Sequence, residues 1–364
     1  MKVGILTFHR AHNYGAIMQL YALKTYIENL GHEVQVIDYI KERIDRGYPK
    51  VRLPKTGTEE EKEILEYGEE AYKRKWEKFN KFIMELDKTE EVHSEEDLEK
   101  LDLDYIICGS DQIWNPNYTE GFDPVYFGGK NKIARKISYA ASMGIKRANL
   151  EDEKTLEDRL SNLDYISVRE ECLRKYAQKF TNKRVQTVLD PSLLLDAEDY
   201  LRIEIKPQYS NYLFVYTMFE NENMMKIADK IAKEKGLTVV ELTQDGNKPN
   251  KEHHIQVSDA GPGEFIGLVN NADFIVTNSF HGTNFALIFN KEFYTIPVEL
   301  VNSRIENILK VSKAEDRCIM NEEEIDLNLK MNYKKIMANL NVGRSKSYEF
   351  LKLALDIEEV VKCS

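Results

Sequence analysis

The chain has 364 residues and a formal net charge of -11, and hydrophobic residues make up 42% of it. This length exceeds that of one typical hydrophobic core, so we expect two domains. The hydrophobic fraction excludes a disordered chain. The negative charge disfavours nucleic-acid binding, because phosphate backbones require clustered Lys and Arg. An anionic ligand would therefore need a local basic pocket.

The cysteines are scattered and form no CxxC pair: Cys108, Cys172, Cys318 and Cys363. This spacing argues against a structural zinc site or a disulfide framework, and we expect no metal site and free thiols in a reducing cytosol. The apolar start of the chain is too short for a signal peptide and predicts a first strand. No segment has the length of a membrane span, so the sequence predicts a cytoplasmic protein.

Strands and helices alternate through the first half of the sequence. Lys2–Phe8 predicts a buried strand, Gly15–Leu30 an amphipathic helix and His32–Tyr39 a second strand, which together form a βαβ unit. Further strands are predicted at Asp104–Cys108, Ile137–Ala141, Tyr165–Val168 and Val185–Leu189, and helices at Leu150–Asn162 and Glu170–Phe180.

Residues 41 to about 100 differ from their surroundings because they are rich in Glu and Lys. Apolar side chains recur there at a spacing of three or four residues: Tyr72, Trp76, Phe79, Ile83 and Leu86. This spacing predicts a helix with one apolar face, and the stripe is too short for a coiled coil. We therefore expect a charged helical insertion that packs on the edge of the sheet.

The second half of the sequence repeats the alternation. Strands are predicted at Tyr212–Thr217, Thr238–Leu242, Phe274–Thr277 and Phe293–Ile296, and helices at Asn223–Lys235, Gly263–Asn271 and Thr283–Phe289. A polar stretch with Pro207 marks the boundary, which divides an N-terminal domain, residues 1–200, from a C-terminal domain, residues 201–364. A final helix around Ser345–Val361 is expected to pack back on the first domain. The fold class is α/β, with two Rossmann-like domains facing a cleft.

Polar turns follow four of these strands, and ligands of open α/β sheets collect at such strand ends. The first turn contains Asn13, Tyr14 and Gly15. It does not match GxGxxG, so the dinucleotide-binding motif is absent. Helix capping by Asn13 and contact with a ligand are equally compatible with this turn.

The second turn follows the strand that ends at Cys108. Gly109 and Ser110 allow a ligand to approach the backbone closely, and Asp111 can accept hydrogen bonds from a hydroxyl. A helix cap followed by a buried Trp114 is the alternative explanation.

The third turn carries Arg169 and Glu170 at the end of a strand. An arginine there can present its planar guanidinium to a carboxylate or a phosphate. A surface pair of Arg169 with Glu170 is the alternative, although adjacent residues rarely face each other on a helix.

The fourth turn is Asn278, Ser279, Phe280, His281 and Gly282, between a buried strand and an apolar helix. Free backbone N–H groups at the start of a helix favour an anion. The imidazole of His281 is a candidate acid, base or anion contact near neutral pH. A histidine that caps its own helix is the alternative.

Taken in order along the chain, these turns resemble the polysaccharide pyruvyl transferase family. The resemblance covers roughly residues 3–310. The motifs that carry it are Asn13-Tyr14-Gly15-Ala16 with Gln19 and Ala22-Leu23, Gly109-Ser110-Asp111-Gln112 with Trp114-Asn115, Ser167-Val168-Arg169-Glu170, Asp190-Pro191, Asn278-Ser279-Phe280-His281-Gly282 and Ser303-Arg304.

This resemblance implies a fold similar to that of GT-B glycosyltransferases. It implies transfer of a pyruvyl group from phosphoenolpyruvate to two hydroxyls of a sugar in a bacterial cell-surface polysaccharide or its precursor, giving a cyclic ketal. Arg169 and His281 match the positions that engage phosphoenolpyruvate, Arg169 through a carboxylate or phosphate and His281 through acid/base work or the leaving phosphate. Asp111 is a weaker candidate for holding the acceptor hydroxyls.

The implied partners are phosphoenolpyruvate as donor substrate and a glycan or lipid-linked sugar as acceptor, with no further cofactor. A lipid-linked acceptor would bring the protein into peripheral contact with a membrane. Two other functions fit the same fold: a GT-B-type glycosyltransferase that uses a nucleotide sugar, and a catalytically silent glycan-binding relative. The insertion at residues 41–100 lies outside the shared motifs, where we expect it to shape the choice of acceptor.

Overall fold

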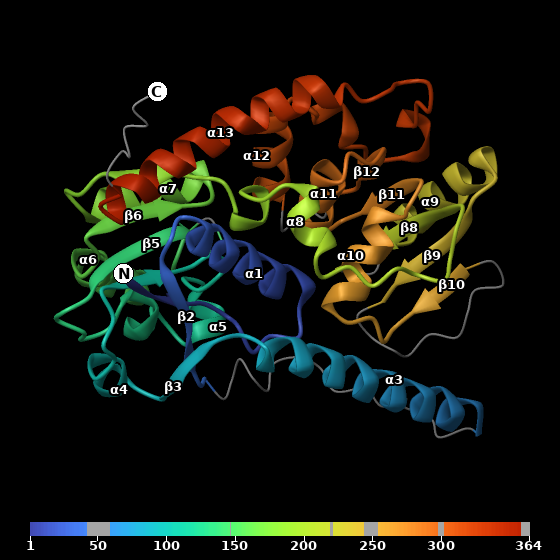
Figure 1. Ribbon diagram of the computed structural model, residues 1–364. Helices are drawn as coiled ribbons and strands as arrows, with labels where there is room; N and C mark the ends of the chain where they lie inside the picture. The colour runs from blue at the N-terminus through green and yellow to red at the C-terminus, as the bar shows by residue number, and fades with distance from the viewer. Residues whose placement is uncertain (42–58, 146, 219–220, 244–253, 298–301, 358–364) are drawn as a thin grey trace, which may run out of the picture.

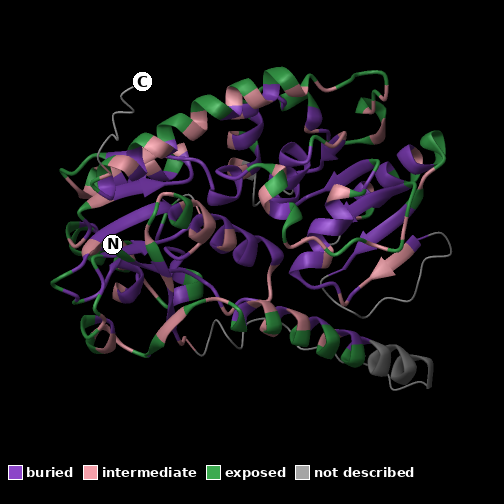
Figure 2. Ribbon diagram, in the orientation of Figure 1, coloured by how far each residue is buried: buried purple, intermediate pink, exposed green. Residues whose placement is uncertain are grey.

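The computed structural model describes residues 1–41, 59–145, 147–218, 221–243, 254–297 and 302–357. Each half of the chain forms one parallel sheet covered by helices, and the two sheets lie side by side (Figure 1). The strands of both sheets are largely buried, whereas exposed residues lie mainly on the outer faces of the helices (Figure 2). The predicted α/β fold with two Rossmann-like domains is confirmed.

The first sheet has seven parallel strands, in the order β3 (Lys88–Val92), β2 (Glu33–Tyr39), β1 (Lys2–Leu6), β4 (Tyr105–Cys108), β5 (Arg135–Ala141), β6 (Tyr165–Val168) and β7 (Val185–Thr187). The central strand β4 is buried at every position, which explains its continuous apolar sequence. The helices of this half are α1 (Tyr14–Asn29), α4 (Glu95–Glu99), α5 (Pro116–Thr119), α6 (Leu150–Ser161), α7 (Glu171–Ala177) and α8 (Ala197–Leu201). Short 3-10 helices are η1 (Pro124–Phe127), η2 (Gln178–Phe180) and η3 (Pro191–Leu193).

The second sheet has five parallel strands, in the order β10 (His254–Val257), β9 (Thr238–Leu242), β8 (Tyr212–Tyr216), β11 (Phe274–Thr277) and β12 (Phe293–Thr295). Its helices are α9 (Glu222–Lys235), α10 (Pro262–Asn270), α11 (Phe280–Ile288), α12 (Asn302–Ser312) and α13 (Tyr333–Ala354), with 3-10 helices η4 (Glu315–Arg317) and η5 (Glu322–Glu324). Among the described residues, no helix has both the length and the hydrophobicity of a membrane span.

The insertion packs differently from the prediction. Its helix α3 (Glu59–Met84) runs from the first domain to a position below α10 of the second domain (Figure 1). Lys78 pairs with Glu264 of α10 at 2.9 Å, and Phe79 packs in a core cluster that extends into the second domain. The prediction that this helix covers the sheet edge was wrong, because β3 occupies that edge beside β2.

The C-terminal helix α13 returns to the first domain (Figure 1). Arg344 donates hydrogen bonds to the carbonyls of Leu193 and Leu195, at 2.7 and 2.8 Å, and Ser347 accepts one from the N–H of Leu189. The helix begins at Tyr333, well before the predicted start, and residues 358–361 of the predicted helix lie outside the described residues. These contacts fasten the second half of the chain to the first.

The N-terminus of α1 is a second contact between the two halves. Tyr14 is fully buried, donates a hydrogen bond to the carbonyl of Ala260 at 2.7 Å and stacks on Phe265 with ring centroids 4.9 Å apart. The first turn of α1 is therefore held against the second domain, at the edge where the strand ends of the first sheet lie.

Candidate active site

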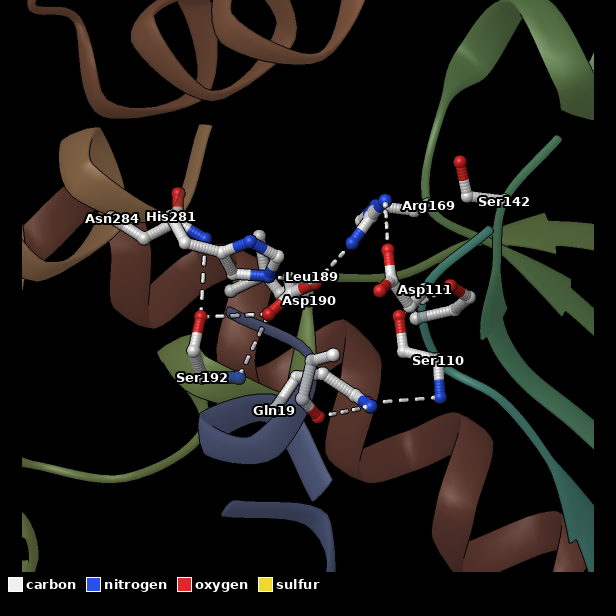
Figure 3. Close-up of polar contacts among 12 residues, drawn as sticks. Gln19, Ser110, Asp111, Ser142, Arg169, Leu189, Asp190, Ser192, His281 and Asn284 are labelled. Atoms are coloured by element: carbon white, nitrogen blue, oxygen red, sulfur yellow. Dashed lines mark hydrogen bonds and ion pairs between the residues drawn. The ribbon is translucent and has the colours of Figure 1, made fainter. Parts of the chain in front are cut away.

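Buried polar side chains from both halves of the chain meet at the strand ends (Figure 3). Arg169 directly follows β6, and Asp190 caps the 3-10 helix η3 a few residues after β7. From the second half, His281 lies in the first turn of α11, directly after β11. The structure thus brings together Arg169 and His281, which were selected from separate turns of the sequence.

Arg169 is 2% exposed and is held by two carboxylates. Its Nη1 donates to Oδ2 of Asp190 at 2.6 Å, and its Nε donates to Oε1 of Glu170 at 3.2 Å. Glu170 in turn accepts a hydrogen bond from Ser142 at 2.8 Å. These bonds fix the orientation of the guanidinium plane.

The remaining nitrogen of Arg169, Nη2, is buried and has no hydrogen-bond partner among the described residues. The carboxylate of Asp111 is 3.6 Å from it, which is an ion pair but too long for a hydrogen bond. A buried donor without a partner is energetically unfavourable. Nη2 is therefore available for a hydrogen bond to an anionic ligand.

His281 completes the group from the second domain. Its Nε2 is 3.7 Å from Oδ2 of Asp190, the oxygen that also binds Arg169. The imidazole packs against Gly15 of α1, where an added Cβ would lie 2.0 Å from Nδ1 of His281. Glycine is required at this position because the imidazole occupies the space that any side chain would fill.

Asp190 is the centre of the group. Burial alone would raise the pKa of its carboxyl, but His281, Arg169 and Ser192 together hold that pKa well below its usual range. Ser192 donates to Oδ1 through both its N–H and its hydroxyl, and Asn284 of α11 donates to that hydroxyl at 3.1 Å. Asp190 is therefore ionised at neutral pH and places a negative charge beside the imidazole of His281.

The ring of Phe280 lies between the imidazole and two guanidinium groups. Its centroid is 5.0 Å from that of His281, 4.7 Å from Cζ of Arg169 and 5.8 Å from Cζ of Arg304. An aromatic face attracts cations without forming a hydrogen bond to them. Phe280 is therefore within cation–π distance of both guanidinium groups.

The turn after β4, residues 109–111, lies beside Arg169. Gly109 has φ +131°, and an added Cβ there would lie 2.1 Å from the carbonyl oxygen of Tyr139. Ser110 is buried, with its N–H donating to Gln19 and its hydroxyl to the carbonyl of Ala140. In this structure Gly109 and Ser110 therefore position Asp111, whose carboxylate faces Arg169.

Two residues of the first turn have other partners. The side chain of Asn13 accepts from the N–H of Ala16 at 3.1 Å and caps α1. Tyr14 uses its hydroxyl in the contact with Ala260. The structure does not bring Tyr14 to the buried polar group.

The fourth turn begins its helix earlier than predicted. Ser279 accepts from the N–H of Gly282 and caps α11, so the helix starts at Phe280 and not at Thr283. Asn278 accepts from the N–H of Met218 at 2.7 Å and ties the turn to the end of β8. An added Cβ on Gly282 would lie 2.3 Å from the hydroxyl of Thr277. These contacts hold His281 in place.

Several residues of this group were not predicted from the sequence to have a role in the site: Glu170, Asp190, Ser192, Asn284 and Arg304. The sequence position of Asp190 could have indicated a role. An Asp-Pro pair directly after a strand caps a helical turn at the ligand-binding edge of the sheet. Its neighbours His281 and Arg169 come from other turns, so its role follows only from the tertiary structure.

Comparison with solved structures defines the class of fold. UDP-GlcNAc 2-epimerase from Methanocaldococcus jannaschii, in complex with UDP-GlcNAc and UDP, has a TM-score of 0.51 and 15% identity, over 98% of this chain and 100% of that one. S. aureus MnaA, solved with UDP, has a TM-score of 0.52 and 10% identity, over 98% and 97%. UDP-GlcNAc 2-epimerase from Neisseria meningitidis, bound to UDP-GlcNAc, has a TM-score of 0.50 and 11% identity, over 97% and 94%. The chain has a GT-B-like fold.

The family is defined by the sequence. The model of the polysaccharide pyruvyl transferase family matches residues 13–299. The chain belongs to this family of enzymes, as the order of the polar turns predicted. A comparison with curated proteins gave no significant match.

Proposed function

We propose that this protein transfers the pyruvyl group of phosphoenolpyruvate to two hydroxyls of one sugar, in a bacterial cell-surface polysaccharide or its precursor, and so forms a cyclic ketal. The observation that carries the proposal is the group of Arg169, Asp190 and His281. It combines a permanent cation with an open N–H and a titratable imidazole, at the edge of the sheets where ligands of α/β proteins bind.

Arg169 is the residue that we assign to the donor anion. Burial opposes its charge, but Asp190, Glu170 and Asp111 raise the pKa of Arg169 above its usual range, so the guanidinium stays charged. A buried guanidinium binds a carboxylate or phosphate oxygen strongly because few water molecules compete for its N–H groups. Nη2 is the nitrogen that remains for this bond.

His281 is the residue that we assign to proton transfer. In its protonated form it would give a proton to the methylene carbon of phosphoenolpyruvate, leaving an oxocarbenium-like centre at the carbon that carries the phosphate ester. The carboxylate of Asp190, 3.7 Å from Nε2, would lie beside the imidazole while it carries the proton. After it, the neutral imidazole can accept the proton of the incoming sugar hydroxyl.

The remaining steps balance the reaction. The first hydroxyl adds to the oxocarbenium-like carbon, the bond from that carbon to the phosphate oxygen breaks, and the second hydroxyl closes the ketal. One hydroxyl proton ends on the new methyl group and the other on the departing phosphate. The side chain of Asp111 is 14% exposed and could accept a hydrogen bond from an acceptor hydroxyl as it approaches.

The substrates and location follow from this reaction. Phosphoenolpyruvate is the donor, the scheme uses no further cofactor, and the acceptor is a glycan or a lipid-linked sugar. Because phosphoenolpyruvate is a cytoplasmic metabolite, we place the reaction in the cytoplasm, with peripheral membrane contact where the acceptor is lipid-linked.

The test is acceptor-dependent release of phosphate from phosphoenolpyruvate, with a panel of galactosides and N-acetylhexosaminides. We expect release with at least one sugar, and losses of at least about a hundredfold in kcat for His281→Gln and Arg169→Gln, as for removal of a proton-transfer or anion-binding group. Asp158→Asn, an exposed substitution on α6, is the matched control and should retain activity. Hydrolysis of a nucleotide sugar without phosphate release would instead support a glycosyltransferase.

A further inference from the structure

A second arginine, Arg304, lies beside the donor site in the first turn of α12. It lies beyond residues 13–299, which match the family model. The same helix contacts the turn after β6, because the side-chain amide of Asn307 donates to the carbonyl of Arg169 at 3.5 Å. The second domain thus brings α12 against the backbone of the residue that we assign to the donor anion.

Arg304 and Arg169 share the ring of Phe280. Their Cζ atoms lie 5.8 and 4.7 Å from its centroid. Among the described residues, no carboxylate forms an ion pair with Arg304, in contrast to Arg169, which has several. Arg304 is therefore a partly buried cation that has no direct carboxylate partner among the described residues and shares an aromatic ring with a second cation.

The electrostatic environment agrees with this geometry. Burial lowers the pKa of Arg304, the charge of Arg169 lowers it further, and Glu170 and Asp111 oppose these effects. Two neighbouring guanidinium groups repel each other unless an anion lies between them or beside them. A bound anion would therefore add to the stabilisation that Glu170 and Asp111 give to the charge of Arg304.

The charges around Arg169 give a second reason for a further cation at the donor site. Around Arg169, three carboxylates face the site: Asp111, Glu170 and Asp190. Arg169 alone does not balance them, and the donor adds further negative charge. Without Arg304 the site would hold an excess of negative charge before any anion entered.

We propose that Arg304 is the second cation of the donor site and binds the phosphate group of phosphoenolpyruvate, while Arg169 binds its carboxylate. This inference rests on the proposed function. Arg304 is only partly buried, whereas Arg169 is almost fully buried. The phosphate leaves toward solvent after each turnover, so the more exposed cation suits it, and the carboxylate stays with the pyruvyl group at the buried cation.

The test is calorimetric binding of phosphoenolpyruvate, inorganic phosphate and pyruvate to the full-length protein and to Arg304→Gln. We expect the substitution to weaken binding of phosphoenolpyruvate and phosphate by about 10- to 100-fold, the effect of losing one or two charged hydrogen bonds. Binding of pyruvate should change little. Arg304→Lys keeps the charge and should restore much of the affinity.

Two controls keep this result interpretable. Lys310→Gln removes an exposed charge from the last turn of the same helix and should leave all three affinities unchanged. Thermal unfolding of each variant shows whether α12 remains folded, and Arg304→Lys serves if Arg304→Gln does not fold. Unchanged phosphate and phosphoenolpyruvate affinities in a folded Arg304→Gln variant overturn the role of Arg304. Failure of the unaltered protein to bind phosphoenolpyruvate overturns the proposed function instead.

Discussion

Substitution of Gly15 by alanine tests the geometry of the site without assuming any reaction. Alanine is more stable than glycine in a helix by up to about 1 kcal/mol, and Gly15 is the second residue of α1. At Gly15 the new Cβ would lie 2.0 Å from Nδ1 and 2.5 Å from Cγ of His281, so the imidazole must move. Overpacking of this kind costs about 1–3 kcal/mol. We therefore expect Gly15→Ala to reduce the free energy of unfolding by up to about 2 kcal/mol.

The same substitution should have the opposite sign when the imidazole is absent. In a His281→Ala background the Cβ has space, and Gly15→Ala should increase the free energy of unfolding by up to about 1 kcal/mol. Urea denaturation of the four proteins in this double-mutant cycle gives the coupling energy, for which we expect about 1–3 kcal/mol. An equal effect of Gly15→Ala in both backgrounds would show that Gly15 and His281 are not in contact and would refute this geometry.

Three further predictions concern buried groups. Tyr14→Phe removes the hydrogen bond to Ala260 and should lower the free energy of unfolding by about 0.5–1.5 kcal/mol while phosphate release is retained; a loss of phosphoenolpyruvate affinity would contradict this assignment. Phe79→Ala should cost about 3–5 kcal/mol in the same measurement, whereas Trp76→Ala, at a position 48% exposed, should cost much less; equal effects would argue against the packing of α3. Asp190 has a pKa held below its usual range, so it stabilises the fold fully above about pH 4 and loses this effect as the pH falls through its folded-state pKa. The difference in unfolding free energy between the unaltered protein and Asp190→Asn should therefore shrink below about pH 4, and a constant difference would contradict it.

Most of the fold follows from local sequence pattern. The strands Tyr165–Val168, Thr238–Leu242 and Phe274–Thr277 lie where predicted, because apolar runs of this length between polar turns form buried parallel strands. The strand β3 was missed because its sequence, Lys-Thr-Glu-Glu-Val, is charged and buries only Val92, as an edge strand can. Hydrophobic pattern therefore gave no signal for this charged edge strand.

The packing of the insertion depended on distant contacts. The helix was predicted correctly, but of its predicted apolar stripe only Phe79 and Ile83 are buried, whereas Trp76 is 48% exposed and Leu86 lies beyond the end of α3. Its partner was not predicted, because Glu264, with which Lys78 pairs, lies in the second domain and far away in the sequence. A periodic stripe shows which face of a helix is buried and not which surface covers it.

In the site, too, some residues could be selected from the sequence and others only from the structure. Arg169 and His281 were selected because residue type and position at a strand end are visible in the sequence. Asp190, which links them, and Arg304, which lies near one of them, could be assigned only from the structure. Gly15 is the reverse case: its sequence position suggested contact with a ligand, whereas its contact in the structure is the imidazole of His281.

The central claim is that this protein adds the pyruvyl group of phosphoenolpyruvate to a sugar after a proton reaches the methylene carbon. The most direct measurement is to carry out the reaction in deuterium oxide with an accepted sugar and to examine the product by NMR and mass spectrometry. The account predicts a sugar that gains the mass of pyruvic acid less one water, with a single deuterium in the methyl group of a cyclic ketal. A product without a ketal, or a sugar transferred from a nucleotide donor, would contradict it.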